Sequence, residues 1–336
     1  MDTRSLGRSG LKVSPICLGT MMFGGPTEEA DADRIVGRAK DAGVNFIDTA
    51  DVYTEGRSEE IVGRAIRRER DHWVLATKLG NPTGPGPNDR GLSRRYMMRA
   101  VEASLKRLGT EAIDIYYLHK EDHSVPLEET VRALGDLLRQ GKIRYYGVSN
   151  HRSWRVAEIC NLADRMGIDR PVVSQPYYNA MNRMPEVEHL PACGFYGLGV
   201  VPYSPLARGI LSGKYHPKAP PPEGSRAGRA DARMMQTEWR KESIAIAQRL
   251  KSHAEKRGIT PSQFATAWVL NNRFVTAAIA GPRTLAQFED YLGAPGYHFT
   301  RADEQLVDRL VPAGHPSTPG YTDPAYPLEG RQPRNG

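Results

Sequence analysis

The sequence predicts an α/β protein, a (β/α)8 TIM barrel with eight strand–helix units in a row. The first observation is a series of eight short apolar runs, each followed by a helix-like stretch. The second is that these runs lack strict apolar–polar alternation, which is typical of parallel strands buried on both faces. A doubly wound sheet is the alternative, but no GxGxxG motif follows the first run.

The predicted strands are rich in β-branched residues, and they lie at 16–20, 44–50, 73–79, 113–119, 143–150, 172–179, 199–206 and 275–281. The predicted helices carry apolar residues at helical spacing, and they lie at 28–43, 58–68, 94–109, 126–142, 153–167, 185–194, 238–257, 261–272 and 284–294. Since no linker divides this series, we expect one barrel domain over residues 1–336.

Four segments lie outside the repeat. Residues 6–14 predict an N-terminal β-hairpin that closes the bottom of the barrel. The Pro- and Gly-rich stretches 80–91 and 215–231 predict long loops after the third and seventh strands, and loops of this length are usually functional lids or disordered. We expect the tail after Pro312 to run over the barrel surface beyond extra C-terminal helices.

The composition is that of a globular protein, with 39% hydrophobic and 25% charged residues among 336. We see no signal peptide and no membrane span, and three distant cysteines without a CxxC motif fit a cytoplasmic protein with reduced thiols. The net charge of +7 comes from scattered arginines, so we expect no nucleic-acid partner. His119 and His123 are four apart but leave a strand rather than lie on a helix, so we expect no metal site.

Polar residues lie where the predicted strands end. They are Asp48, Lys78, His119, Asn150, Gln175 and Tyr203, and Tyr53 follows the second strand closely. In a barrel of this type the active site is built at the carboxyl ends of the strands. Each residue alone has an ordinary structural explanation, but several polar residues at consecutive strand ends indicate a catalytic group.

The chemistry of this group depends on Tyr53 and Lys78. A tyrosine hydroxyl ordinarily titrates near pH 10. A lysine in an apolar strand needs a partner, and Asp48 is the natural one. A nearby cation stabilises phenolate, so we expect Lys78 to lower the pKa of Tyr53 and make it a general acid nearer neutral pH. His119 is placed to share that hydrogen bond or to orient a carbonyl oxygen.

At this point the sequence resembles the aldo-keto reductase family, including its potassium-channel β-subunit branch. The resemblance spans the chain and rests on FIDTADVY (46–53), ATKLG (76–80), YYLH (116–119), GVSN (147–150), SQPYYN (174–179), YSPLARGILSGKY (203–215) and AGPRTLAQFED (280–290). It implies a barrel that binds NADPH across its mouth and reduces aldehydes or ketones by hydride transfer. The implied catalytic residues are Tyr53 as acid, with Asp48, Lys78 and His119.

The resemblance also implies the residues that hold NADPH/NADP+. Ser149, Asn150 and Gln175 would bind the carboxamide, Tyr203 would stack on the nicotinamide, and Thr20, Met21 and Asp48 would lie beside it. The residues along the pyrophosphate would be Ser204, Pro205, Leu206, Ala207 and Arg208, with Lys214 and Arg226 nearby. Gly281, Arg283, Gln287 and Asp290 would hold the adenosine end, where an arginine fork suits a 2'-phosphate.

Two differences within the family matter. Many relatives carry asparagine where this chain has Tyr291, which leaves the adenine contacts open. The channel β-subunit branch carries asparagine where this chain has His119, so the complete catalytic group favours an enzyme acting on a small-molecule carbonyl. A cofactor-binding regulatory subunit with slow turnover and an unrelated barrel such as a sugar-phosphate isomerase are the other hypotheses. The natural substrate and the oligomeric state cannot be read from the sequence.

Overall fold

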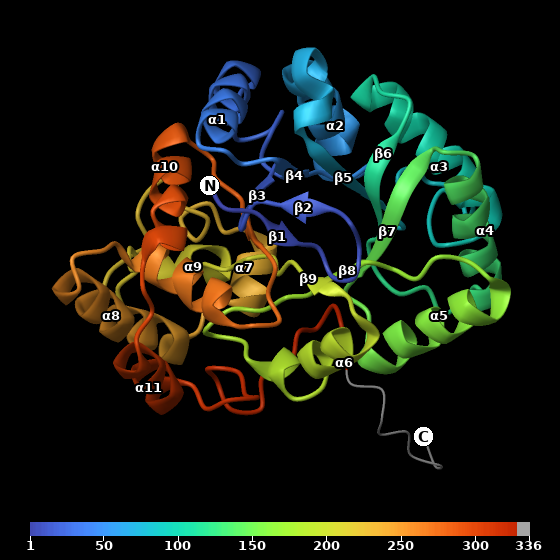
Figure 1. Ribbon diagram of the computed structural model, residues 1–336. Helices are drawn as coiled ribbons and strands as arrows, with labels where there is room; N and C mark the ends of the chain where they lie inside the picture. The colour runs from blue at the N-terminus through green and yellow to red at the C-terminus, as the bar shows by residue number, and fades with distance from the viewer. Residues whose placement is uncertain (328–336) are drawn as a thin grey trace.

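The computed structural model describes residues 1–327, and its centre is a sheet of eight parallel strands (Figure 1). In chain order the strands are β3 (Ile16–Gly19), β4 (Phe46–Asp48), β5 (Val74–Leu79), β6 (Ile113–Leu118), β7 (Ile143–Ser149), β8 (Val173–Gln175), β9 (Gly199–Val200) and β10 (Ala278–Ala280). Their spatial order is the chain order, with β10 beside β3. Just before β10, Thr276 N donates to Val200 O of β9 at 2.8 Å, which closes the ring. The predicted barrel is confirmed.

The helices form the outer layer around the strands (Figure 1). They are α1 (Glu29–Asp41), α2 (Arg57–Ile66), α3 (Arg94–Leu108), α4 (Leu127–Arg139), α5 (Ser153–Met166), α6 (His189–Tyr196), α7 (Ala232–Thr237), α8 (Lys241–Lys256), α9 (Pro261–Asn271), α10 (Leu285–Leu292) and α11 (Arg301–Leu310). The short helix α7 follows the long predicted loop 215–231 and was not expected. Asp231 caps its N-terminus, because the Asp231 side chain accepts a hydrogen bond from Met234 N.

Several strands are shorter than the apolar runs that predict them, and for two of them proline explains the difference. The expected strands at 172–179 and 199–206 reduce to β8 and β9. Proline follows each of them, at Pro176 and Pro202, and proline has no N–H to continue a ladder. The residues beyond these prolines leave the sheet as loops, which carry Tyr203 to the open end of the barrel.

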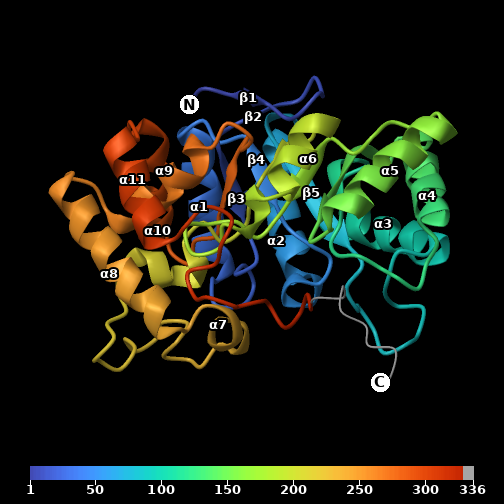
Figure 2. The same ribbon diagram turned by 90° about the horizontal axis from the view of Figure 1, so that it is seen from below.

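The N-terminal hairpin of β1 (Arg4–Ser5) and β2 (Lys12–Val13) covers the opposite end, as Figure 2 shows. Leu6 and Val13 point into the barrel and are fully buried. Gly7 makes this possible, because its φ is +57° and a Cβ there would lie 2.5 Å from Gly197 O. The predicted closing hairpin is confirmed.

Two layers of apolar side chains stabilise the fold. The larger lies between the strands and the helices, and the smaller fills the barrel interior around Phe46, Ile115 and Tyr117. This explains why the strands read as continuous apolar runs, since both of their faces are buried.

The C-terminal tail crosses from α11 to the open end of the barrel (Figure 2). Ser317 N donates to Met181 O at 2.8 Å, and Asp323 forms an ion pair with Arg233 at 2.6 Å. The expected course over the barrel surface therefore ends beside the strand ends. Within residues 1–327 no helix combines the length and the apolar character needed to cross a membrane, and all three cysteines are buried free thiols.

Candidate active site

The polar residues predicted at the strand ends meet at one end of the barrel. Asp48 ends β4, Lys78 lies in β5, Ser149 ends β7 and Gln175 ends β8. Register places Asp48 opposite Ala76 and Ser149 opposite Gln175 in neighbouring strands. Gln175 Nε2 donates to Asp48 Oδ2 at 2.9 Å across the barrel mouth. Asp48, Ser149 and Gln175 border a cavity of about 350 Å³.

Lys78 is the centre of the predicted catalytic group. Its side chain is 0% exposed, and its Nζ donates hydrogen bonds to Asp48 Oδ1 and to Thr49 O, the latter at 2.7 Å. Its third contact is the Tyr53 hydroxyl oxygen at 3.2 Å. Because a buried ammonium must be paired, Asp48 explains how this lysine remains charged inside an apolar strand. Tyr53 receives the remaining hydrogen bond and faces the cavity.

The pKa of Tyr53 differs from the expectation. Burial raises it above its ordinary value, and the positive charge of Lys78 only partly offsets this effect. The expected net lowering is therefore wrong. Burial lowers the pKa of Lys78, but Asp48 and Tyr53 outweigh that effect and raise it, so the lysine stays charged. At neutral pH Tyr53 is a protonated phenol beside an ammonium group.

His119 lies beside Tyr53 with its ring edge-on, and the two ring centroids are 5.9 Å apart. Burial first, and then the charges of Lys78 and Lys120, hold the pKa of His119 well below its usual range. The imidazole is therefore neutral at pH 7. Its Nδ1 is buried and has no hydrogen-bond partner among residues 1–327. A neutral ring lining the cavity can share a hydrogen bond with a polar ligand.

The backbone around the cavity is strained in several places. Seven residues other than glycine have positive φ in or beside the segments that line it: Thr54, Glu55, Asn150, Ser204, Ala207, Arg208 and Ala230. Such conformations cost about 1–3 kcal/mol each and cluster at functional sites. Thr54 and Glu55 directly follow Tyr53, and Asn150 directly follows β7. The strained backbone therefore lies in the segments that orient the side chains of the site.

Ser149, Asn150 and Gln175 form a connected group on neighbouring strand ends. Ser149 Oγ donates to Gln175 O at 2.8 Å, and Asn150 Nδ2 donates to His119 O at 2.9 Å. Tyr203 Oη donates to Asn150 Oδ1 at 2.7 Å. The Tyr203 ring stacks on Tyr177 with centroids 5.5 Å apart. A fixed aromatic ring beside amide groups is suited to an aromatic amide ligand.

Positive charge gathers at the other side of the same cavity. The lining residues there include Arg208, Lys214, Arg226, Arg229, Arg233 and Arg283. Partial burial and the charges of Arg283, Arg226 and Arg229 lower the pKa of Lys214. Arg283 Nη1 donates to Gly224 O at 2.7 Å, which joins the loop 215–231 to the start of α10. A cluster of cations with few acidic partners is suited to a phosphorylated ligand.

Comparison with known proteins agrees with this geometry. A sequence model described as the aldo/keto reductase family matches residues 15–311, which is most of the chain. The chain belongs to the aldo/keto reductase family. Members of this family are NAD(P)-dependent oxidoreductases, so the barrel, the polar strand ends and the basic cavity have a common explanation.

Curated relatives cover almost all of the chain. A probable voltage-gated potassium channel subunit beta of Arabidopsis thaliana is 38% identical over 299 residues, 88% of this chain and 91% of the relative. The uncharacterized oxidoreductase YrpG of Bacillus subtilis (strain 168) is 36% identical over 331 residues, 95% of this chain and 98% of the relative. The aldo-keto reductase dtxS3 of Metarhizium robertsii is 35% identical over 342 residues, 92% of this chain and 91% of the relative.

The structure brings nearly all the residues expected from the aldo/keto reductase resemblance to one cavity. Those lining it are Thr20, Met21, Asp48, Tyr53, His119, Ser149, Asn150, Gln175, Tyr203, Ser204, Pro205, Leu206, Arg208, Lys214, Arg226, Gly281, Arg283, Gln287 and Asp290. Lys78 lies directly behind Tyr53. Ala207 is different, because its side chain is fully buried in the core and does not line the cavity. Any contact of Ala207 with a ligand must therefore come from its backbone.

Sequence reasoning missed several residues of this aldo/keto reductase cavity. Arg229 and Arg233 reach it from the loop 215–231 and from α7, and Tyr326 reaches it from the tail. The arginines at 226, 229 and 233 stand in one short run, which was a usable signal. Nothing in the sequence indicated Tyr326. Tyr291, the departure noted within the family, also lines the cavity and is 6% exposed.

Proposed function

We propose that this aldo/keto reductase uses NADPH to reduce an aldehyde or ketone to an alcohol, with Tyr53 as general acid. The observation that carries the proposal is the position of the Tyr53 hydroxyl. It lies 3.2 Å from the buried Lys78 ammonium and lines a cavity whose far side is strongly basic. A phenol that accepts a hydrogen bond from a cation keeps its own proton available for donation.

Each neighbour of Tyr53 has a separate part. Lys78 stabilises the phenolate that Tyr53 becomes after proton donation, because the ammonium lies within hydrogen-bond reach. Asp48 keeps Lys78 charged and in place, and Gln175 holds the second oxygen of that carboxylate. His119, neutral and lining the cavity, orients the carbonyl oxygen of the substrate.

The donor set fits NADP(H), which when bound supplies the hydride. Ser149, Asn150 and Gln175 would hold the carboxamide, and Tyr203 would stack against the nicotinamide ring. Arg208, Lys214 and Arg226 would bind the pyrophosphate. At the adenosine end, Arg283 extends from the start of α10, and Gln287 Oε1 accepts a hydrogen bond from Arg283 N at 2.8 Å. This cluster of cations favours a cofactor with a 2'-phosphate, that is NADP over NAD.

A regulatory subunit that binds cofactor and turns over slowly is the second candidate. The observation that favours it is the similarity to probable voltage-gated potassium channel β subunits. The sequence identity to the Arabidopsis relative is 38%. The presence of His119 beside Tyr53 favours the enzyme, since the full group of four polar residues is assembled.

The experiment that tests the proposal combines binding with turnover. NADPH is titrated against the protein, with quenching of protein fluorescence as the readout. Consumption of NADPH is then followed with a panel of aldehydes and ketones, including a nitrobenzaldehyde. Saturable quenching with steady turnover supports the reductase. Tight binding with turnover no faster than that of the Tyr53→Phe variant supports the regulatory subunit, and absence of NADPH binding refutes both.

A further inference from the structure

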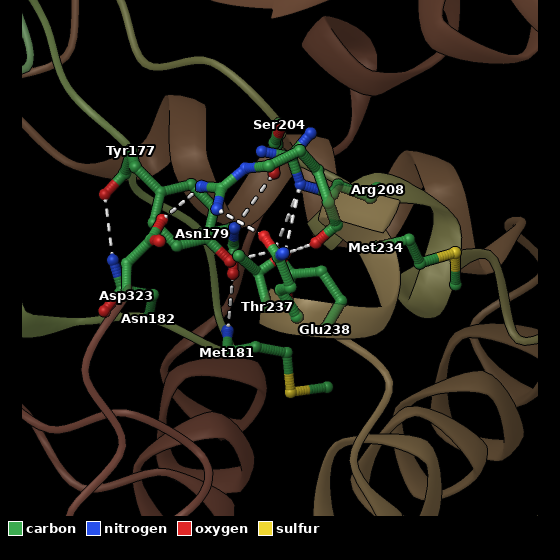
Figure 3. Close-up of polar contacts among 12 residues, drawn as sticks. Tyr177, Asn179, Met181, Asn182, Ser204, Arg208, Met234, Thr237, Glu238 and Asp323 are labelled. Carbon is green, nitrogen blue, oxygen red and sulfur yellow. Dashed lines mark hydrogen bonds and ion pairs between the residues drawn. The ribbon is translucent and has the colours of Figure 1, made fainter. Parts of the chain in front are cut away.

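A buried carboxylate, Glu238, lies behind the cofactor cavity and has no part in the group around Tyr53. It directly follows α7, and its side chain is 0% exposed. Tyr177 Oη donates a hydrogen bond to Glu238 Oε1, and Arg208 Nε lies 4.0 Å from the same oxygen (Figure 3). Glu238 Oε2 has no hydrogen-bond partner among residues 1–327. Such a group costs several kcal/mol to bury, so its presence calls for an explanation.

Through Tyr177, Glu238 contacts the stacked pair of tyrosine rings beside the cavity. Tyr177 stacks on Tyr203, with centroids 5.5 Å apart and ring planes 28° from parallel. Tyr203 in turn donates to Asn150 Oδ1 at 2.7 Å. The hydrogen bond from Tyr177 to Glu238 therefore fixes the rear ring of the pair whose front ring lines the cavity.

The second contact leads to the basic side of the cavity. Arg208 Nε donates to Thr237 Oγ1 at 3.2 Å and faces Glu238. The two outer nitrogens of the Arg208 guanidinium make no hydrogen bond within residues 1–327, and this residue lines the cavity. One edge of the guanidinium is therefore held by residues 237 and 238, and the other edge is free to meet an anion.

The loop that carries Arg208 needs such support. Ser204, Ala207 and Arg208 all have positive φ, between +47° and +56°. These conformations persist only where the surroundings hold them. Asn179 Nδ2 donates to Ser204 O at 3.0 Å at the start of the loop, and Glu238 with Thr237 holds its end at Arg208.

We infer that Glu238 is a positioning residue for cofactor binding, which orients Arg208 toward the cofactor phosphates and fixes Tyr177 behind Tyr203. This rests on the proposed function, because it takes the cavity to be an NADP(H) site. Glu238 supports binding rather than competing with it, since it faces the Nε edge of Arg208 and leaves the outer edge open. Removing its charge therefore weakens the cofactor complex.

A double-mutant cycle tests this inference. The dissociation constant of NADPH is measured by fluorescence quenching for wild type, Glu238→Gln, Arg208→Met and the double variant. Residues in contact typically couple with a free energy corresponding to about 2- to 100-fold in affinity. We expect Glu238→Gln to weaken NADPH at least fivefold in the wild-type background. With Arg208→Met already present, the same change should have less than a twofold effect.

The controls separate positioning from general damage and from failure of the proposed function. Asp303→Asn changes another buried carboxylate, which does not line the cavity, and should leave NADPH affinity unchanged. Glu238→Asp draws the carboxylate back from Arg208 by one methylene and takes the place of Glu238→Gln in the cycle if that variant does not fold. The inference is overturned if Glu238→Gln weakens NADPH equally in the wild-type and Arg208→Met backgrounds. It is also overturned if Glu238→Gln binds NADPH more tightly than wild type. If wild type itself fails to bind NADPH, the proposed function fails first.

Discussion

The Lys78 ammonium donates a hydrogen bond to the Tyr53 hydroxyl oxygen at 3.2 Å, from a side chain that is 0% exposed. The cation therefore acts on the phenol oxygen and leaves the phenol proton free. Burial raises the pKa of Tyr53, and Lys78 offsets part of that rise. Burial keeps Tyr53 protonated at neutral pH, and Lys78 provides a charge that stabilises phenolate once the proton has moved.

Replacing Lys78 with methionine tests that relationship through the pH profile. Without the cation the pKa of Tyr53 rises further, because burial is no longer offset. We expect kcat to fall at pH 7 and the alkaline limb of carbonyl reduction to move to higher pH. The measurement is kcat/KM from about pH 8 to pH 12, because burial already raises the pKa of Tyr53 above its ordinary value in the unsubstituted protein. Lys40→Met, on the surface, is the control, and an unmoved limb in Lys78→Met would leave Lys78 with a structural role only.

Arg283→Ala tests the choice of cofactor. Glu289 pairs with Arg38 and Asp290 accepts from Thr260, so neither acid occupies Arg283. A charge-assisted hydrogen bond to a 2'-phosphate contributes about 1.5–3 kcal/mol, so NADPH should weaken roughly 10- to 100-fold. NADH affinity should change little.

The measurement for Arg283 is the dissociation constant of each cofactor by fluorescence quenching. Arg38→Ala is the matched control, because it removes an arginine that binds Glu289 of the same helix from outside the cavity. Equal weakening of both cofactors would show that Arg283 does not read the phosphate.

We predict that the protein loses stability in acid because the Asp303 carboxylate becomes protonated. Burial raises its pKa, but hydrogen bonds from His253 and Thr300 outweigh this and lower the pKa from 3.8 to about 2. A lowered folded-state pKa contributes stability above the unfolded value, and this is lost as pH falls toward 2. The contribution at pH 7 is about 2 kcal/mol. Urea unfolding from pH 7 to 2 should show a smaller acid loss for Asp303→Asn, and an identical pH dependence would contradict this.

Gly7→Ala tests the hairpin that closes the barrel. The new methyl group would meet Gly197 O and Gly199 N at 2.5 Å, at a residue with φ of +57°. We expect a loss of about 2 kcal/mol or more in the free energy of unfolding. Gly10→Ala in the same hairpin is the control, since a Cβ there meets nothing within 4 Å. Similar midpoints in thermal unfolding for the two variants would argue against a tightly packed closure.

The barrel could be predicted because parallel strands buried on both faces leave an unbroken apolar pattern, and polar residues interrupt it where strands end. That pattern located Asp48, Lys78 and Gln175. The resemblance supplied the roles expected of more distant residues such as Arg283. Loop and tail conformations depend on tertiary contacts, so Tyr326 was not predictable. The net direction of the Tyr53 pKa depends on how deeply the ring is buried, which sequence patterns do not report.

The measurement that tests the central claim most directly is carbonyl reduction by Tyr53→Phe alongside its NADPH affinity. The phenylalanine ring fills the same space, so only the proton donor is removed. General acid catalysis typically contributes ~10²–10⁴-fold, so we predict a loss of that order in kcat with an unchanged dissociation constant for NADPH. Turnover within about threefold of wild type, at equal NADPH affinity, would contradict the assignment of Tyr53 as the acid.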